Sequence, residues 1–186
     1  MNKIKLIIIC LFFSFACSYV CAQPVNKDID WDKLEYFLYQ ELKAQHPDES
    51  EAEILQAVGY TTMKSNNRWE RATVYFKKAV ELDPKLYFSW YSLGLINIDT
   101  EEGYNYFKKA IEANPNFPAP YYWMAYYRCR SREDKKAIPL FQKYLEAAKG
   151  NKEEAGRIKI AEEVLQDLLS GKESENLSMM RRPGKK

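Results

Sequence analysis

Three copies of one spaced set of residues lie between Leu55 and Lys149, and this repetition limits the possible folds more than any other feature. In each copy a large residue is followed three positions later by a second large residue, and then at once by glycine or alanine. A small residue, an aromatic residue and a third packing residue come later, at intervals of four and three. The copies are Leu55, Val58, Gly59, Ala72, Phe76 and Ala79; Trp90, Leu93, Gly94, Gly103, Phe107 and Ala110; and Tyr121, Met124, Ala125, Ala137, Phe141 and Tyr144. Self-similarity of this kind is typical of repeat architectures, whose units bury their apolar faces against neighbouring units.

The distances between equivalent positions indicate a shortened middle copy. Gly103 and Ala137 are 34 residues apart, whereas Ala72 and Gly103 are 31 apart. Leu55 and Trp90 are separated by 35 residues. Loss of three residues at the turn inside the middle copy, near residues 97–100, accounts for these shifts together.

The pattern, with Pro84 and Pro115 after its first two copies, resembles the tetratricopeptide repeat. The resemblance covers about residues 52–151 and implies an all-α fold, a right-handed α-solenoid of three helical hairpins. The repeats are expected at about 52–85, 87–117 and 118–151. In this family small residues mark the sites where two helices meet, and a bulky residue there typically costs about 1–3 kcal/mol. The corresponding positions are Gly59, Gly94 and Ala125 on first helices, and Ala72, Gly103 and Ala137 on second helices.

Two further helices are expected to flank the repeats within a domain of residues 23–170. The first, at about 30–46, carries Leu34, Phe37, Leu38 and Leu42 at helical spacing. The second, at about 152–170, has one apolar and one charged face, as a capping helix needs. Residues 171–186 show no periodicity, and we expect them to be disordered.

Residues 1–22 have the composition of a secretory signal peptide. Lys3 and Lys5 precede an apolar run, and Val20-Cys21-Ala22 places small residues before a cleavage site at Gln23. A membrane anchor and a lipidated cysteine are the alternatives, although the apolar run is shorter than the ~20 residues of a spanning helix. Cleavage would leave no transmembrane anchor, and such a leader suits the periplasm or the cell exterior of a Gram-negative bacterium.

Composition argues against several function classes. The sequence has a net charge of +2, which becomes zero without Lys3 and Lys5, so it lacks the excess of cations expected of a nucleic-acid binder. Cys129 is the one cysteine beyond residue 22 and His46 is the one histidine, too few for a zinc site. The sequence has no phosphate-binding loop or hydrolase motif. We therefore expect no enzymatic activity, no cofactor and no metal.

The resemblance implies a concave groove lined by the first helix of each repeat. Carried over position by position, it gives these candidate binding residues: Tyr60, Met63, Lys64, Phe88, Tyr91, Leu95, Tyr122, Tyr126 and Arg130. Cys129 should border the groove and be partly accessible. The terminal helices could instead fold over this face and bury the tyrosines.

The expected function is an exported, non-enzymatic adaptor that binds a peptide segment or a partner protein of the cell envelope. The alternative is an aromatic-lined receptor for a glycan or another small ligand, which would stack on Tyr91, Tyr122 and Tyr126. Such a receptor needs exposed rings, whereas a peptide groove needs a trough with cations such as Lys64 or Arg130.

Overall fold

A computed structural model describes residues 31–64 and 68–181, and within these ranges the protein is helical and contains no strand. The expected signal peptide, residues 23–30 and the last five residues lie outside the described ranges. No helix in the described part is long and apolar enough to cross a membrane. The elements are α2 (Trp31–Gln45), α3 (Glu51–Lys64), α4 (Trp69–Leu82), α5 (Tyr87–Ile96), α6 (Glu101–Ala113), α7 (Ala119–Arg130), α8 (Asp134–Ala147), the short 3-10 helix η1 (Lys152–Glu154), α9 (Ala155–Ser170) and α10 (Glu175–Arg181).

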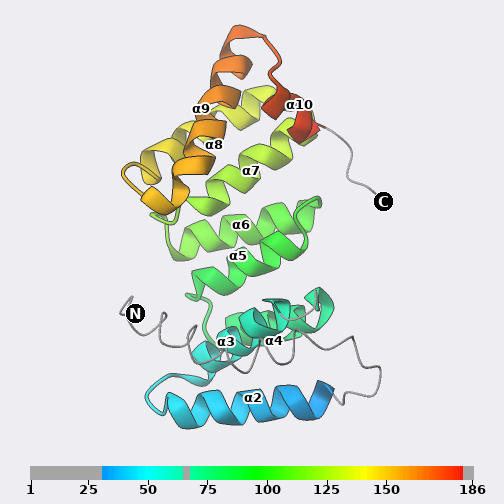
Figure 1. Ribbon diagram of the computed structural model, residues 1–186, viewed down its shortest axis with the longest axis vertical. Coiled ribbons are helices and arrows are strands. Elements are labelled where there is room, and N and C mark those ends of the chain that lie inside the picture. Colours follow the sequence, from blue (N-terminus) through cyan, green and yellow to red (C-terminus); the bar gives the residue numbers. More distant parts are fainter. Residues whose placement is uncertain (1–30, 65–67, 182–186) are drawn as a thin grey trace.

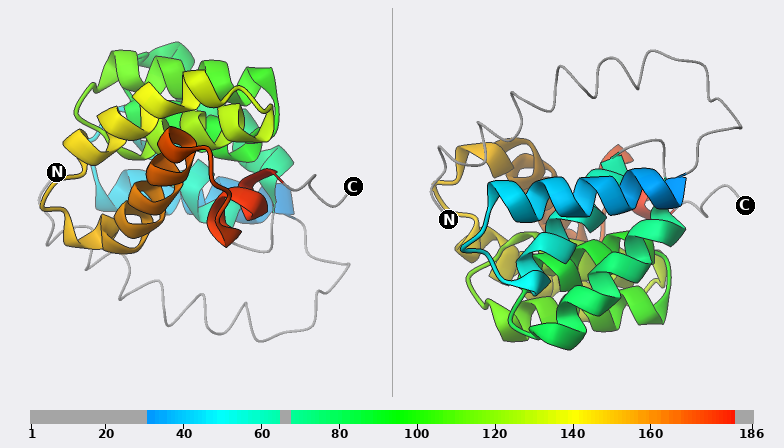
Figure 2. Two further views of the ribbon diagram at one scale, coloured as in Figure 1. Left: turned by 90° about the horizontal axis from the view of Figure 1, so that it is seen from above. Right: turned by 90° about the horizontal axis from the view of Figure 1, so that it is seen from below.

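The helices pack in consecutive antiparallel pairs, which are stacked along the long axis of the molecule (Figure 1). The pairs are α3 with α4, α5 with α6, and α7 with α8, and each pair contacts the next through its second helix. Helix α2 packs on α3 at one end, and α9 packs on α8 at the other, as the two end views show (Figure 2). The expected all-helical, paired arrangement is thereby confirmed.

Local signals set the ends of several helices. The Ser50 hydroxyl accepts from the backbone N–H of Glu53, whose carboxylate accepts from the Ser50 N–H, so the two residues form a capping box for α3. The Thr100 hydroxyl accepts from the Gly103 N–H at the start of α6. At the end of α9, Gly171 adopts φ +70, the left-handed conformation that glycine takes without strain.

Glycine is needed where paired helices touch. A Cβ atom on Gly94 would lie 2.4 Å from Cε1 of Phe107, a fully buried ring. A Cβ on Gly59 would lie 3.0 Å from Cε1 of Phe76. The sequence-level expectation that these positions lie at helix contacts therefore matches the geometry.

The middle pair is shorter than its neighbours because its first helix is shorter, whereas its turn at residues 97–100 is no shorter than the turn at residues 131–133. Helix α5 has 10 residues, whereas α3 has 14 and α7 has 12. The chain turns back so tightly that a Cβ on Gly103 would lie 2.0 Å from the Asn97 carbonyl oxygen. Only a glycine fits at this place without movement of the backbone.

Helix α2 is held by an ionic and hydrogen-bonded cluster, and its inner face differs from the expected one. Glu35 is buried and accepts hydrogen bonds from Arg71 Nε at 2.7 Å and from the Tyr75 hydroxyl at 2.6 Å, both on α4. Leu42 is buried as predicted, but Leu34 and Phe37 are exposed. The apolar spacing misplaced this face because it considers apolar residues alone, whereas Glu35 is buried by virtue of its hydrogen-bond partners on α4.

The prediction that residues 171–186 are disordered is wrong for the segment that forms α10. This helix packs on α7 and α9, and its Leu177 and Met180 side chains are 1% and 5% exposed. Seven residues form too short a helix to be stable alone in water. Tertiary contact creates this helix, which explains why local sequence patterns did not reveal it.

Helix α8 continues through Pro139 without a break. The proline lies in the second turn of the helix and its side chain is exposed. The sequence alone predicts a mild local irregularity rather than a broken repeat here, and the structure shows an unbroken helix.

Candidate functional site

The nine candidate binding residues lie on α3, α5 and α7, the first helix of each pair. Side-chain contacts link neighbouring units near these residues. The Tyr60 ring on α3 meets the Phe88 ring on α5 edge-on at 5.6 Å between centroids. Between the next two units, Arg130 Nε lies 3.1 Å from an Asp99 carboxylate oxygen.

Tyr91 is a core residue, contrary to the prediction that it is exposed to a partner. Its side chain is 9% exposed, and its ring contacts Phe107 and Phe117 at centroid distances of 6.0 and 5.0 Å. The hydroxyl accepts a hydrogen bond from Trp123 Nε1 at 3.2 Å. Burial raises the pKa of Tyr91 above its ordinary value.

Tyr122 is also buried, at 6% exposure. Its ring packs edge-on against Trp123, Phe141 and Tyr144, with centroids 5.2 to 6.0 Å away. Both tyrosines are buried for the same reason. Each ring fills the space between its own unit and the following helices, and the repeat pattern alone does not show how completely those helices cover it.

The remaining candidates form a partly accessible surface, which we call the first-helix surface: Tyr60, Met63, Lys64, Phe88, Leu95 and Tyr126. Lys64 is exposed, and the other five are half-buried. The Lys64 ammonium lies 4.8 Å from the centroid of the Tyr60 ring, within the range of a cation–π contact. This surface combines aromatic, aliphatic and cationic groups.

Arg130 is engaged within the protein. Besides its ion pair with Asp99, its Nη1 donates to the Tyr126 hydroxyl at 3.2 Å. A carboxylate from a ligand would have to compete with Asp99 for this cation. Arg130 therefore joins two neighbouring units, and its availability to a ligand is lower than the sequence suggested.

Cys129 does not border an open groove. Its side chain is fully buried, and desolvation raises the pKa of its thiol to about 12. Since the thiolate is the reactive form, a buried thiol of this kind is inert in the folded state.

A polar cluster at the start of α9 was missed by the sequence analysis. The Tyr144 hydroxyl donates to Glu154 Oε2 at 2.8 Å, and Arg157 Nη1 donates to the same carboxylate at 2.7 Å. The sequence predicts a charged, outward face for the helix at about 152–170, yet the Glu154 side chain is only 12% exposed. The spacing of three residues between Glu154 and Arg157 can be read from the sequence, whereas the hydrogen bond from Tyr144 on α8 cannot.

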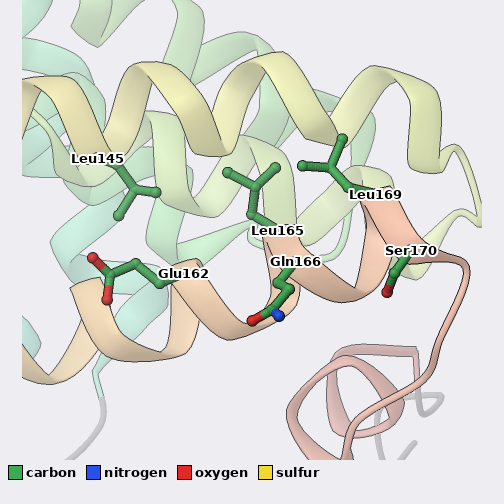
Figure 3. A pocket seen from close by; sticks show the side chains of 6 residues that line it. All are labelled: Leu145, Glu162, Leu165, Gln166, Leu169 and Ser170. Carbon is green, nitrogen blue, oxygen red and sulfur yellow. The ribbon is translucent and has the colours of Figure 1, made fainter.

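A hollow of about 410 Å³ lies between α8 and α9. Leu145 of α8 and Leu165 and Leu169 of α9 form its apolar part, and Glu162, Gln166 and Ser170 stand along its α9 side (Figure 3). Leu169 is 64% exposed, so the hollow is open. It lies on α9 at the end of the stack, away from the first-helix surface.

Side chains that could bind a metal ion do not gather in the described part of the chain. Residues 31–64 and 68–181 hold no group of three or more histidine, cysteine, aspartate and glutamate side chains that could bind a metal ion. His46 Nδ1 lies 3.7 Å from a Glu49 carboxylate oxygen, just past α2. The chain matches none of the protein-family models and none of the curated proteins with which it was compared.

Proposed function

We propose that the chain is an exported, non-enzymatic interaction module of the tetratricopeptide type, a right-handed solenoid whose first helices bind a peptide segment or protein of the cell envelope. Support for the repeat type comes from the small residues at the helix contacts and from the paired helices. Support for export comes from the composition of residues 1–22. The first-helix surface is the observation that carries the binding function.

The chemistry of this surface suits a polypeptide ligand. Tyr60, Phe88 and Tyr126 present aromatic rings that can contact apolar side chains. The two tyrosines also carry hydroxyl groups, which can form hydrogen bonds with backbone amides. Lys64 adds a cation at one end. Tyrosine and other aromatic residues are among those that most often dominate protein–protein binding energies.

The glycan-receptor alternative loses two of its three stacking rings. Tyr91 and Tyr122 are buried among other aromatic side chains and cannot receive a sugar face. Tyr126 alone is half-buried. We therefore favour the polypeptide ligand.

Site-specific photo-crosslinking tests the proposal. A photo-reactive amino acid placed at Met63 or at Leu95 should cross-link one partner protein in envelope extract. The same amino acid at the exposed positions Lys108 of α6 and Lys143 of α8 should not. Cross-links of equal yield at all four positions would refute a binding surface on the first helices.

Paired truncations then test which side chains bind. A Tyr60→Ala, Phe88→Ala double variant should lose affinity for the cross-linked partner by about tenfold or more, as expected when interface aromatics are removed. A Lys108→Ala, Lys143→Ala variant is the matched control and should bind like the parent. Both variants should keep the helical circular dichroism spectrum of the parent.

A further inference from the structure

Helix α10 is attached to the rest of the protein by few contacts. Leu177 and Met180, three residues apart, enter the apolar cluster that also contains Ala125, Cys129 and Val164. At its end, Arg181 Nη2 lies 2.5 Å from a carboxylate oxygen of Asp134 on α8. In Figure 1, α10 lies beside the C-terminal half of α7.

The polar contacts of α10 are made with acidic side chains on its neighbours. Asn176 Nδ2 donates to Glu163 Oε2 at 2.8 Å, and the Ser174 N–H donates to Asp167 Oδ2 at 2.8 Å. The acidic residues Glu163, Asp167 and Asp134 therefore lie around the apolar residues beneath α10.

The docking of α10 is also imperfect. The Arg181–Asp134 pair uses one oxygen of the carboxylate, while Arg181 Nε and Asp134 Oδ1 are buried without a hydrogen-bond partner. A buried polar atom without a partner lowers the stability of the docked state. Of these two atoms, Asp134 Oδ1 stays on the surface when α10 leaves, so a ligand that donates to both oxygens of Asp134 would make a hydrogen bond that α10 does not make.

The connection between α9 and α10 is short and begins with Gly171 in the left-handed conformation. A short tether holds α10 near its surface at a high effective concentration, on the order of millimolar. Weak contacts are then sufficient to keep it docked. A free helix at a concentration of about 1 μM must therefore bind this surface about a thousandfold more tightly than α10 does in order to displace it.

We propose that the surface of α7 and α9 beneath α10 is a helix-binding site, that α10 is its tethered occupant, and that a short amphipathic helix of a partner protein displaces it. The partner helix carries two long apolar side chains three residues apart, followed by a cation that pairs with Asp134. This inference rests on the proposed function and identifies the class of ligand.

The site adjoins the first-helix surface, because α7 carries both Tyr126 and the buried Cys129. A partner helix longer than α10 can contact Tyr126 while it occupies the α10 position. This additional contact is the source of the affinity that α10 itself lacks.

Cys129 provides a reporter, since it is fully buried and the Arg181–Asp134 pair lies close enough to influence the pKa of its thiol. The test uses protein in which Cys10, Cys17 and Cys21 are serine, so that Cys129 is the one thiol whether or not the leader is removed. Met180→Ala should raise the alkylation rate of Cys129 by about tenfold or more, because truncation of a buried methionine weakens docking. Met179→Ala is the matched control, since Met179 is 45% exposed, and should leave the rate unchanged.

A synthetic peptide of residues 172–181 then tests binding in trans. Added to the Met180→Ala protein, it should restore slow alkylation of Cys129 in a saturable manner. A peptide in which Leu177 and Met180 are serine should not. Arg181→Gln is a second way to release α10 without a cavity, for use if circular dichroism shows that Met180→Ala is unfolded.

An unchanged alkylation rate in both folded variants, or failure of the parental peptide to protect Cys129, would overturn the proposed site. This outcome is distinct from failure of the proposed function. Protection by the peptide with no cross-linked partner would leave a helix-binding site in place and count against the envelope-adaptor function.

Discussion

A glycine-to-alanine series tests how the helices meet. The largest tractable effect is expected at Gly94, where the new Cβ would lie 2.4, 2.5 and 2.9 Å from three carbons of the Phe107 ring. Phe107 is fully buried, so the ring cannot move away into solvent. Overpacking of this kind typically costs about 1–3 kcal/mol.

The substitution of Gly94 by alanine also stabilises the helix, and this gain offsets part of the overpacking cost. Alanine is better than glycine inside a helix by about 1 kcal/mol. The matched control is Gly156→Ala in α9, where an added Cβ has no atom within 4 Å. Gly156→Ala should therefore leave stability unchanged or raise it by up to about 1 kcal/mol, whereas Gly94→Ala should lower it by up to about 2 kcal/mol.

Thermal and urea denaturation followed by circular dichroism measure these differences. For a chain of this size, 1 kcal/mol corresponds to about 2–4 °C in melting temperature. Gly59→Ala, with a nearest approach of 3.0 Å, should fall between Gly94→Ala and the control. The reasoning is refuted if Gly94→Ala melts at or above the temperature of Gly156→Ala.

Three further predictions concern other parts of the chain. Glu35→Gln should lower the free energy of unfolding, measured by urea titration, by about 1.5–3 kcal/mol, because the substitution removes a charged acceptor from Arg71 and Tyr75. The control Phe37→Ser, at an exposed position of the same helix, should change the free energy of unfolding little. Burial raises the pKa of the Cys129 thiol from 9.0 to about 12 and favours its neutral form in the folded state, so stability should decline as pH rises through this range, and Cys129→Ala should show a smaller decline. Mass analysis of exported protein should find an N-terminus at Gln23, and an intact or acylated N-terminus would contradict the signal-peptide prediction.

Much of the fold could be predicted because its signals are local. The large–large–small pattern and the small–aromatic pattern recur at intervals that fit a helix, and both mark residues that the structure buries, such as Leu93, Gly94 and Phe107. The altered spacing of the middle copy located its shortening near residues 97–100, where α5 ends early and Gly103 approaches the Asn97 carbonyl. These features depend on neighbours within one helical pair, so the repeat itself carries the information.

The candidate site could be predicted only in part. The sequence identified the helices that carry Tyr60 and Phe88, which remain partly accessible, and it also selected Tyr91 and Tyr122, which are buried. A boundary position of one pair becomes core or surface according to what the next pair places over it. No pattern within a single copy contains that information.

The amino-acid sequence by itself determined the helical pairs, the glycines at their contacts and the place where the middle pair is shortened, because periodicity and side-chain size act over a few residues. Only the tertiary structure decided that Glu35 is buried against Arg71 and that Glu154 binds Tyr144. It also decided that residues 175–181 form a helix on α7. These contacts join distant parts of the chain, and a polar or short segment becomes buried or helical only when its partner surface is already formed.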